Sequence, residues 1–336
     1  MSLLANFSSK ALETNAPNHG QFAAMAYQDI YAFCSLIIMT ISVLLCLLVI
    51  YLSYRIYSVN RRREYTWIMG FNALVDIVYS LALGIVATCG IATHDQFFLT
   101  VENPLLQDMH PFFLHVAIFL VSLMTLAIAP CNTVHFYYRY CMICKDVLWS
   151  KRKYFFLYLA ALSYLTINGV VFHFSGTADT AESRRSLEEM QGRPAPRHFV
   201  TRQDDPLFML CVVNCQIIFT VEYGIIIFCG VRIILKMREK VGATASSTRR
   251  AQKYVIIVMM LQAAYPLILY FIPIMYLTSM VGFGGQINDV SYMGATSIQL
   301  LPALNSLSVL TMLPSYRRAF LHNRHLETAL TMISET

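Results

Sequence analysis

Two carboxylic acids lie within long apolar stretches of the sequence, where an ionised side chain is costly. Asp76 stands in the stretch that begins near Thr66, and Glu222 stands in the one that begins near Leu207. A charge at the centre of a membrane helix costs about 2.5 to 3.5 kcal/mol on the insertion scale. All seven lysines and nearly all arginines lie outside these stretches. We therefore expect each acid to be protonated, hydrogen-bonded to another helix, or beside a bound ion or water.

A single arginine stands at the end of another apolar stretch, within His135-Phe-Tyr-Tyr-Arg-Tyr140. Asn132, His135 and Arg139 share one helical face, because they are three and four residues apart. Arg139 either anchors the helix at the lipid headgroups or is an arginine that a receptor holds at rest and turns toward a G protein when active. The residues alone favour neither role.

The nine histidines do not have the spacing of a metal site. His110 and His115 are five residues apart, whereas helical metal sites place their ligands three or four residues apart. We therefore expect no metal, no cofactor and no enzymatic activity. A retinal Schiff base would need a lysine in the last apolar stretch, which has none.

Seven apolar stretches long enough to cross a bilayer must position these residues. The sequence is 57% hydrophobic and 13% charged, against roughly 25% charged residues in soluble domains. A hydrocarbon core of about 30 Å takes roughly 20 helical residues to cross. The predicted spans are residues 31–54, 66–91, 109–138, 154–174, 207–231, 254–280 and 288–313. We predict an all-α membrane protein, a bundle of seven transmembrane helices.

Basic residues gather in the loops on one side of this bundle, and short loops rich in Lys and Arg stay in the cytoplasm. On that side lie 19 of the 25: Arg55, Arg61, Arg62, Arg63, Arg139, Lys145, Lys151, Arg152, Lys153, Arg232, Lys236, Arg238, Lys240, Arg249, Arg250, Lys253, Arg317, Arg318 and Arg324. The amino-terminal segment 1–30 is then extracellular. The helical domain covers 31–313, with a long outer loop at 175–206 and an inner loop at 232–253. The tail 314–336 is cytoplasmic, and we expect the outer loop to form a partly mobile cap over the bundle.

Two further features concern the extracellular side. Asn6-Phe-Ser8 fits an N-glycosylation acceptor, although such triplets also arise by chance. No cysteine lies in the long outer loop, so a bridge from that loop to the third helix is not available. Cys89 and Cys211 lie near outer helix ends and either pair with each other or remain free buried thiols, and we favour the free thiols.

The sixth predicted span contains Pro266 and Pro273, two turns apart on nearly one face. Each proline removes a backbone hydrogen bond, so we expect this helix to be kinked and able to swing its inner end outward. Proline is also tolerated in membrane helices without any such role.

We expect a ligand pocket in the outer half of the bundle, lined by mostly apolar and aromatic side chains, as small-molecule pockets tend to be. Depth along the helices selects Phe112, His115, Phe119, Asn214, Tyr270, Tyr276 and Gln299. An amine would usually need a carboxylate within the third span, and the nearest one, Asp108, lies at its outer edge. The expected ligand is therefore small and uncharged.

These features resemble a known family, the nematode serpentine chemoreceptors, and within it the Str-type group. The resemblance spans all seven helices. Its best-matched points are His135-Phe136 with Tyr138-Arg139-Tyr140, Gln262 followed by Pro266-Leu-Ile-Leu and Ile272-Pro273, and Tyr316-Arg317-Arg318-Ala319. It implies a plasma-membrane G-protein-coupled receptor on chemosensory neurons, located in their cilia. Its partners would be a small environmental molecule, a heterotrimeric G protein and membrane lipids, and no nucleic acid.

The chain departs from related receptors at two points. Str-type members often have a proline in the seventh helix where Ser306 follows Asn305, so a switch role for Asn305 is less secure. Tyr138 stands where rhodopsin-like receptors place an acid, so a resting lock between that acid and the adjacent Arg139 is absent. The residues that the resemblance implies in switching and G-protein coupling are Tyr138, Arg139, Tyr140, Pro266, Pro273, Asn305 and Tyr316.

A ligand-gated channel or transporter of seven helices is the alternative. The sequence has no internal repeat and no span with periodic charge, which argues against it. Current or flux that persists without G proteins would identify such a protein.

Overall fold

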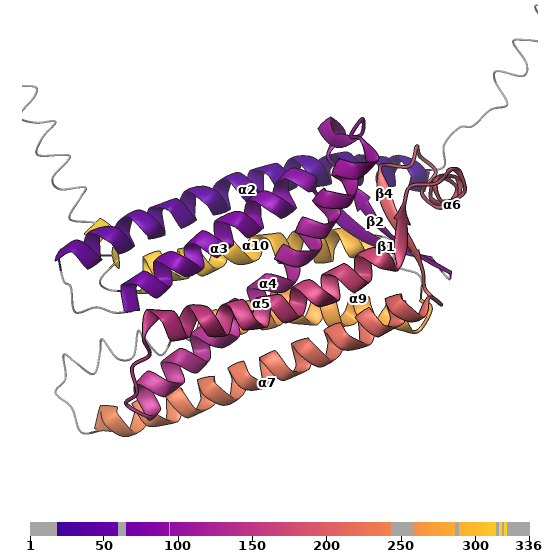
Figure 1. The fold of residues 1–336 in the computed structure, drawn as a ribbon. Coiled ribbons are helices and arrows are strands. Elements are labelled where there is room, and N and C mark those ends of the chain that lie inside the picture. The colour runs from indigo at the N-terminus through magenta and orange to yellow at the C-terminus, as the bar shows by residue number, and fades with distance from the viewer. Residues whose placement is uncertain are drawn as a thin grey trace, which may run out of the picture.

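The computed structural model describes residues 19–59, 65–93, 95–242, 257, 260–285, 289–313, 316–317 and 319–320. Long helical segments run side by side through it (Figure 1). They are α2 His19–Val59, α3 Tyr65–Val86, α4 Pro111–Cys144, α5 Lys151–Phe174, α7 Pro206–Gly242, the segment Met260–Gly282 that ends in α9 Ile272–Gly282, and α10 Asp289–Met312. All except α10 are long and apolar enough to cross a membrane. The prediction of a seven-helix membrane bundle is confirmed.

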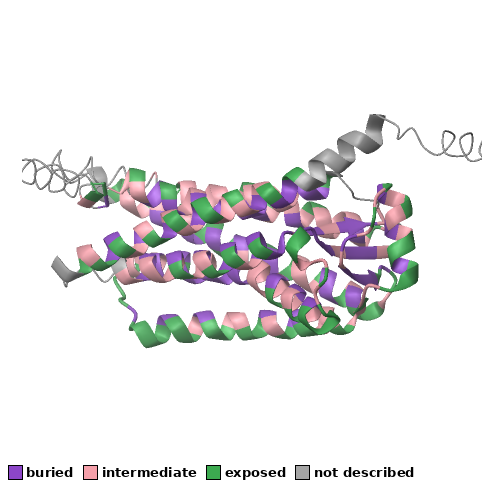
Figure 2. Cartoon of the chain, turned by 90° about the horizontal axis from the view of Figure 1, so that it is seen from above, coloured by how far each residue is buried: buried purple, intermediate pink, exposed green. Residues whose placement is uncertain are grey.

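Local sequence signals set several helix boundaries. His110 caps α4 by accepting the Phe112 N–H at 3.2 Å, and Pro111 occupies the first helical position, where its missing N–H costs nothing. Ser150 caps α5 by accepting the Lys153 N–H. Many large apolar side chains of the helices are exposed, as a lipid-facing surface requires. Figure 2 shows the exposed residues along the outer sides of the helices.

The predicted second span, residues 66–91, extends beyond the end of the helix into a strand. Helix α3 ends at Val86, and Ala87 has a positive φ of 50° that turns the chain. Residues Thr88–Ala92 then form strand β1. A short apolar run can be either a strand or the end of a buried helix, and hydropathy cannot distinguish them.

A four-stranded antiparallel sheet lies across one end of the bundle (Figure 1). Its strands are β1, β2 Gln96–Val101, β3 Gly176–Ala178 and β4 His198–Arg202, in the order β1-β2-β4-β3. The short helices η1 Pro104–Leu106 and α6 Ala181–Gln191 belong to the same end of the molecule. We call the four strands and α6 the cap. The predicted outer loop 175–206 therefore contains β3, α6 and β4.

Other predicted boundaries differ from the structure or lie outside it. Helix α2 begins at His19, within the predicted segment 1–30, and α7 continues to Gly242, within the predicted inner loop 232–253. The start of the sixth span, Asn6, the rest of that inner loop and most of the tail after residue 313 lie outside the described residues.

Candidate ligand cavity and switch region

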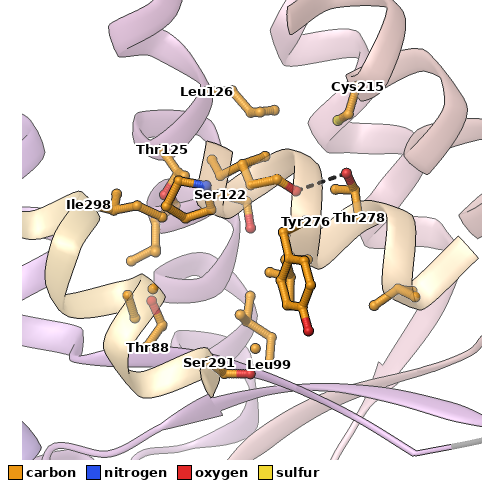
Figure 3. A pocket seen from close by; sticks show the side chains of 18 of the residues that line it. Thr88, Leu99, Ser122, Thr125, Leu126, Cys215, Tyr276, Thr278, Ser291 and Ile298 are labelled. Carbon is orange, nitrogen blue, oxygen red and sulfur yellow. Dashed lines mark hydrogen bonds between the residues drawn. The ribbon is translucent and has the colours of Figure 1, made fainter. Parts of the chain in front are cut away.

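A cavity of about 580 Å³ lies beneath the sheet, among α4, α5, α7, α9 and α10. Figure 3 shows hydroxyl groups on its walls, from Ser122 and Thr125 of α4, Thr278 of α9 and Ser291 of α10. Its other lining side chains are mostly apolar or aromatic, and among the residues that the structure describes none of them is Asp, Glu, Lys, Arg or His. A cavity of this size and composition suits a small, uncharged and largely apolar molecule that carries a hydrogen-bonding group.

One face of the sheet forms the roof of this cavity. Successive side chains of a strand point to opposite faces, and the register pairs Gly90 with Leu99 and places Thr88 and Phe97 on the same face. These four residues, which we call the roof, all line the cavity. The opposite face of the sheet packs against Leu187 of α6, which is fully buried. The sheet and α6 are thus two layers that cover the cavity.

Two of the side chains predicted to contact a ligand, Tyr276 and Gln299, line the cavity. Tyr270 is fully buried, and its hydroxyl donates a hydrogen bond to the carbonyl of Thr125, itself a lining residue. Tyr270 therefore connects the middle of the sixth helical segment to the cavity wall without reaching the cavity.

The other predicted contacts are not among the lining residues: Phe112, His115, Phe119 and Asn214. The Asn214 amide donates to the Asn168 side chain at 2.8 Å, between α7 and α5. Phe112 is exposed on the surface of α4. The His115 ring packs on that of His173 with centroids 4.8 Å apart. Depth selected these residues, but the rotation of each helix about its axis decides which side chains face the cavity.

Several lining residues were not singled out in the sequence. Ser122 and Thr125 are three residues apart on α4, so small polar side chains on one face of an apolar span were a usable signal. The roof residues had no such signal, because they face the cavity only once β1 has paired with β2.

A buried ion pair ties the cap to the bundle. Arg193, in the segment after α6, donates to a Glu102 oxygen at 2.8 Å. The other Glu102 oxygen accepts hydrogen bonds from the hydroxyls of Thr100 at 2.6 Å and Tyr292 of α10 at 2.9 Å. Each carboxylate oxygen therefore has a donor, which is what a buried acid requires.

A second ion cluster lies beside β3. The side chain of Asp179 is almost fully buried and pairs with Arg184 and, at 2.9 Å, with Arg197. Burial by itself raises the pKa of this carboxyl, but the hydrogen bonds and charges of the two guanidinium groups outweigh it and hold the pKa below its usual value. The cluster joins the start of α6 to the segment that leads into β4.

A smaller cavity of about 40 Å³ lies deeper among α3, α4 and α10. The predicted residues Asp76 and Asn305 both line it, together with Asn132 and His135. Asn72 and His135 are hydrogen-bonded between their side-chain nitrogens at 2.7 Å. This volume is enough for about two water molecules with several polar partners.

The Arg139 side chain lies inside the bundle. It is 3% exposed, and its Nη2 lies 3.9 Å from the sulfur of Met69 on α3. The neighbouring Tyr138 is also buried and packs edge to face on Tyr154 of α5, with ring centroids 5.9 Å apart. In this arrangement Arg139 is not positioned to anchor the helix at lipid headgroups.

Two more predicted switch residues join elements near the same end. The Tyr140 ring packs on Phe228 of α7, with centroids 5.9 Å apart. The Tyr316 hydroxyl hydrogen-bonds to that of Ser53 on α2 at 2.8 Å, and both side chains are buried.

The sixth helical segment departs from α geometry between its two prolines, where the sequence predicts a kink. Residues Leu267–Phe271 form a π-helical turn, η2, between Pro266 and Pro273. Pro273 has no N–H to give the preceding turn, and a π turn is one way for a helix to adjust to that loss. The carbonyl of Pro266 accepts a hydrogen bond from the Tyr223 hydroxyl of α7 at 2.9 Å.

Of the remaining predicted residues, Glu222 and Cys89 lie apart from both cavities, whereas Cys211 lines the larger one. One carboxyl oxygen of Glu222, Oε2, is buried and has no hydrogen-bond partner among the described residues. Cys89 and Cys211 are buried free thiols. In the described part of the chain no three His, Cys, Asp or Glu side chains converge as metal ligands would.

Comparisons with known proteins agree with this architecture. The profile of the serpentine type 7TM GPCR chemoreceptor Str family matches residues 31–193 and 205–321. The Caenorhabditis elegans protein described as "G-protein coupled receptor str-33" is 24% identical over 174 residues, which are 51% of this chain and 49% of that protein. The chain therefore aligns with about half the length of this relative. Squid rhodopsin has a similar fold, with a TM-score of 0.64 and 13% identity over 92% of this chain and 87% of that one. From the family match, this chain belongs to the Str family of serpentine seven-transmembrane G-protein-coupled chemoreceptors.

Proposed function

We propose that this receptor binds a small, uncharged environmental molecule in the 580 Å³ cavity and activates a heterotrimeric G protein. The observation that carries the proposal is the cavity itself, whose described lining residues include seven that bear a hydroxyl group and none that is charged. In a member of a chemoreceptor family, such a cavity fits a neutral ligand better than an amine or an acid.

The packing suggests how occupancy of the cavity would reach the opposite end of the bundle. A ligand beside Thr125 would press on the backbone whose carbonyl accepts the Tyr270 hydroxyl. Tyr270 belongs to the π turn, and the turn is also held by Tyr223 through the Pro266 carbonyl. Movement of this turn would swing the inner end of the sixth segment and expose Arg139 to a G-protein helix.

This mechanism requires the cap to lie outside the cell. The ends of α4 and α7 that are close to Arg139 would then lie on the cytoplasmic side. The bias of basic residues toward that side supports this orientation. The membrane would be the plasma membrane of a sensory neuron, including its cilia.

The test is G-protein activation in cells that express the receptor, across a panel of volatile and water-soluble neutral molecules. The variants are Arg139→Ala, Ser122→Phe to fill the cavity, and the control Arg202→Ala on the exposed outer side of the cap. With surface expression matched, we expect both test variants to lose the response and the control to keep it. A response unchanged in Arg139→Ala and Ser122→Phe would refute the proposal. Current that persists without G proteins would identify a channel instead.

A further inference from the structure

The cavity is closed on the cap side by two layers of structure. The roof residue Phe97 is nearly buried, and Phe98, which points to the other face of the sheet, is fully buried. Above that face lies α6, whose Leu187 is also fully buried. A molecule arriving through the cap would have to separate the sheet from α6 and then break ladder hydrogen bonds within the sheet.

The lining residues that are exposed on the surface of the bundle all lie elsewhere. They are Ile272 at 54%, Tyr276 at 49%, Val290 at 53% and Met293 at 61%. We call these four the portal. All four belong to α9 or α10, and every lining residue on the sheet, α4, α5 and α7 is buried or half-buried. Among the described residues, the open side of the cavity therefore lies between α9 and α10.

The α9 side of this opening is at the depth of the hydrocarbon core. Tyr276 precedes the end of α9 at Gly282 by six residues, and Ile272 precedes it by ten. At 1.5 Å per residue these side chains lie about 9 and 15 Å below the end of the helix. Exposed faces of membrane helices at that depth contact lipid chains.

We propose that the ligand enters this cavity sideways from the bilayer, through the portal between α9 and α10. The ligand class follows from the route: a neutral amphiphile with an aliphatic body and a single hydroxyl or carbonyl group, which dissolves in the leaflet nearest the cap. Tyr276 of α9 and Ser291 of α10 line the cavity (Figure 3), and their hydroxyls can receive the polar group as it leaves the lipid. This inference deepens the proposed function and depends on the same cavity.

The experiment is time-resolved photolabelling of the full-length receptor in lipid nanodiscs. The probe is a ten-carbon primary alcohol that carries a diazirine, and mass spectrometry measures labelling of Thr278 and Ser297 inside the cavity. Met293→Trp narrows the portal from its lipid-facing side. Leu210→Trp is the matched control, because Leu210 is exposed on α7 and does not line the cavity.

We expect Met293→Trp to slow cavity labelling by about tenfold, because the larger side chain obstructs access through the portal. Val290→Trp should act in the same direction, and Leu210→Trp should match the wild type. Wild-type labelling rates in both portal variants would overturn the inference. So would equal labelling of Thr278 by a photoreactive phospholipid, because the cavity would then hold an acyl chain and not select an alcohol.

The outcomes separate this inference from the proposed function. Portal-dependent labelling without G-protein activation by any compound would uphold the route and leave the signalling role unsupported. A ligand response that requires Ser122 and Arg139 but is insensitive in rate to both portal variants would uphold the receptor function and refute the lateral route.

Discussion

The side-chain amide of Gln299 on α10 donates a hydrogen bond of 3.0 Å to the hydroxyl of Tyr31 on α2. That hydroxyl in turn donates to the carbonyl of Thr88 in the roof at 2.8 Å. Gln299 lines the cavity. One tyrosine therefore links the cavity wall, α2 and the roof.

Replacing Tyr31 with Phe removes both bonds and little volume. We expect the free energy of unfolding to fall by about 1 to 3 kcal/mol, because the Gln299 amide and the Thr88 carbonyl lose a buried partner. Thermal unfolding of the purified receptor in detergent measures the change. Tyr54→Phe, at an exposed tyrosine of the same helix, serves as the control and should leave the midpoint unchanged. Equal midpoints for the two variants would show that the link adds nothing to stability.

The ion cluster around Asp179 predicts that the stability of the receptor depends on pH. The pKa of Asp179 is lower in the folded chain than in the unfolded one, so its stabilising contribution is complete above the unfolded-state value of about 3.9. That contribution is lost as pH falls through the lower, folded-state value. Asp179→Asn should therefore destabilise the receptor at pH 7 by about 1 to 3 kcal/mol, and the difference from wild type should shrink below about pH 4.

Thermal unfolding measured from pH 3 to pH 7 follows this difference. The exposed pair Arg202 and Asp204 supplies the control, because both side chains are largely in water. Asp204→Asn should leave the unfolding temperature unchanged at every pH. A difference between Asp179→Asn and wild type that is constant across this range would contradict the assigned charge interaction.

Gly176 of β3 lies so close to β4 that the sheet should not tolerate a larger residue at this position. A Cβ at this position would lie 2.6 Å from Cζ of Phe199 and would also collide with the carbonyl oxygen of Val200. Gly176→Ala should therefore separate β3 from β4 and increase hydrogen exchange of the β4 amides. Gly224→Ala in α7 is the matched control, because a Cβ there meets no atom within 4 Å. It should be neutral or stabilise the helix by about 0.5 to 1 kcal/mol. Unchanged hydrogen exchange of the β4 amides in Gly176→Ala would show that β3 and β4 accommodate the added Cβ without losing protection of these amides.

The helices were predictable and the strands of the cap were not, for a physical reason. A span must satisfy its own backbone in lipid, so length and hydropathy identify it from local sequence. The strand containing Phe98 is defined by pairing with Val200, about a hundred residues away, and neither segment carries that information alone. The same limit applied to the ligand residues: depth selected both Phe112 and Tyr276, but only the packed helices orient Tyr276 toward the cavity and Phe112 away from it.

The bond from Tyr223 to Pro266 predicts a change in basal signalling. Arg139 is buried in this arrangement, so its guanidinium is not presented to a G protein. We therefore regard the arrangement as the resting one. Tyr223→Phe removes the hydroxyl that holds the Pro266 carbonyl, and about 1 kcal/mol of lost stabilisation shifts a two-state equilibrium roughly fivefold.

We expect basal G-protein activation to rise by up to about fivefold in Tyr223→Phe at equal surface expression. The increase should disappear in the double variant with Arg139→Ala if both residues act on one switch. Tyr164→Phe is the control. The Tyr164 hydroxyl, on the exposed side of α5, donates a hydrogen bond to the Asn214 side chain and does not contact the sixth helical segment. Basal activity that stays at the wild-type level in Tyr223→Phe would mean that the π turn does not hold the receptor at rest, and activation would then have to proceed through another pair of helices.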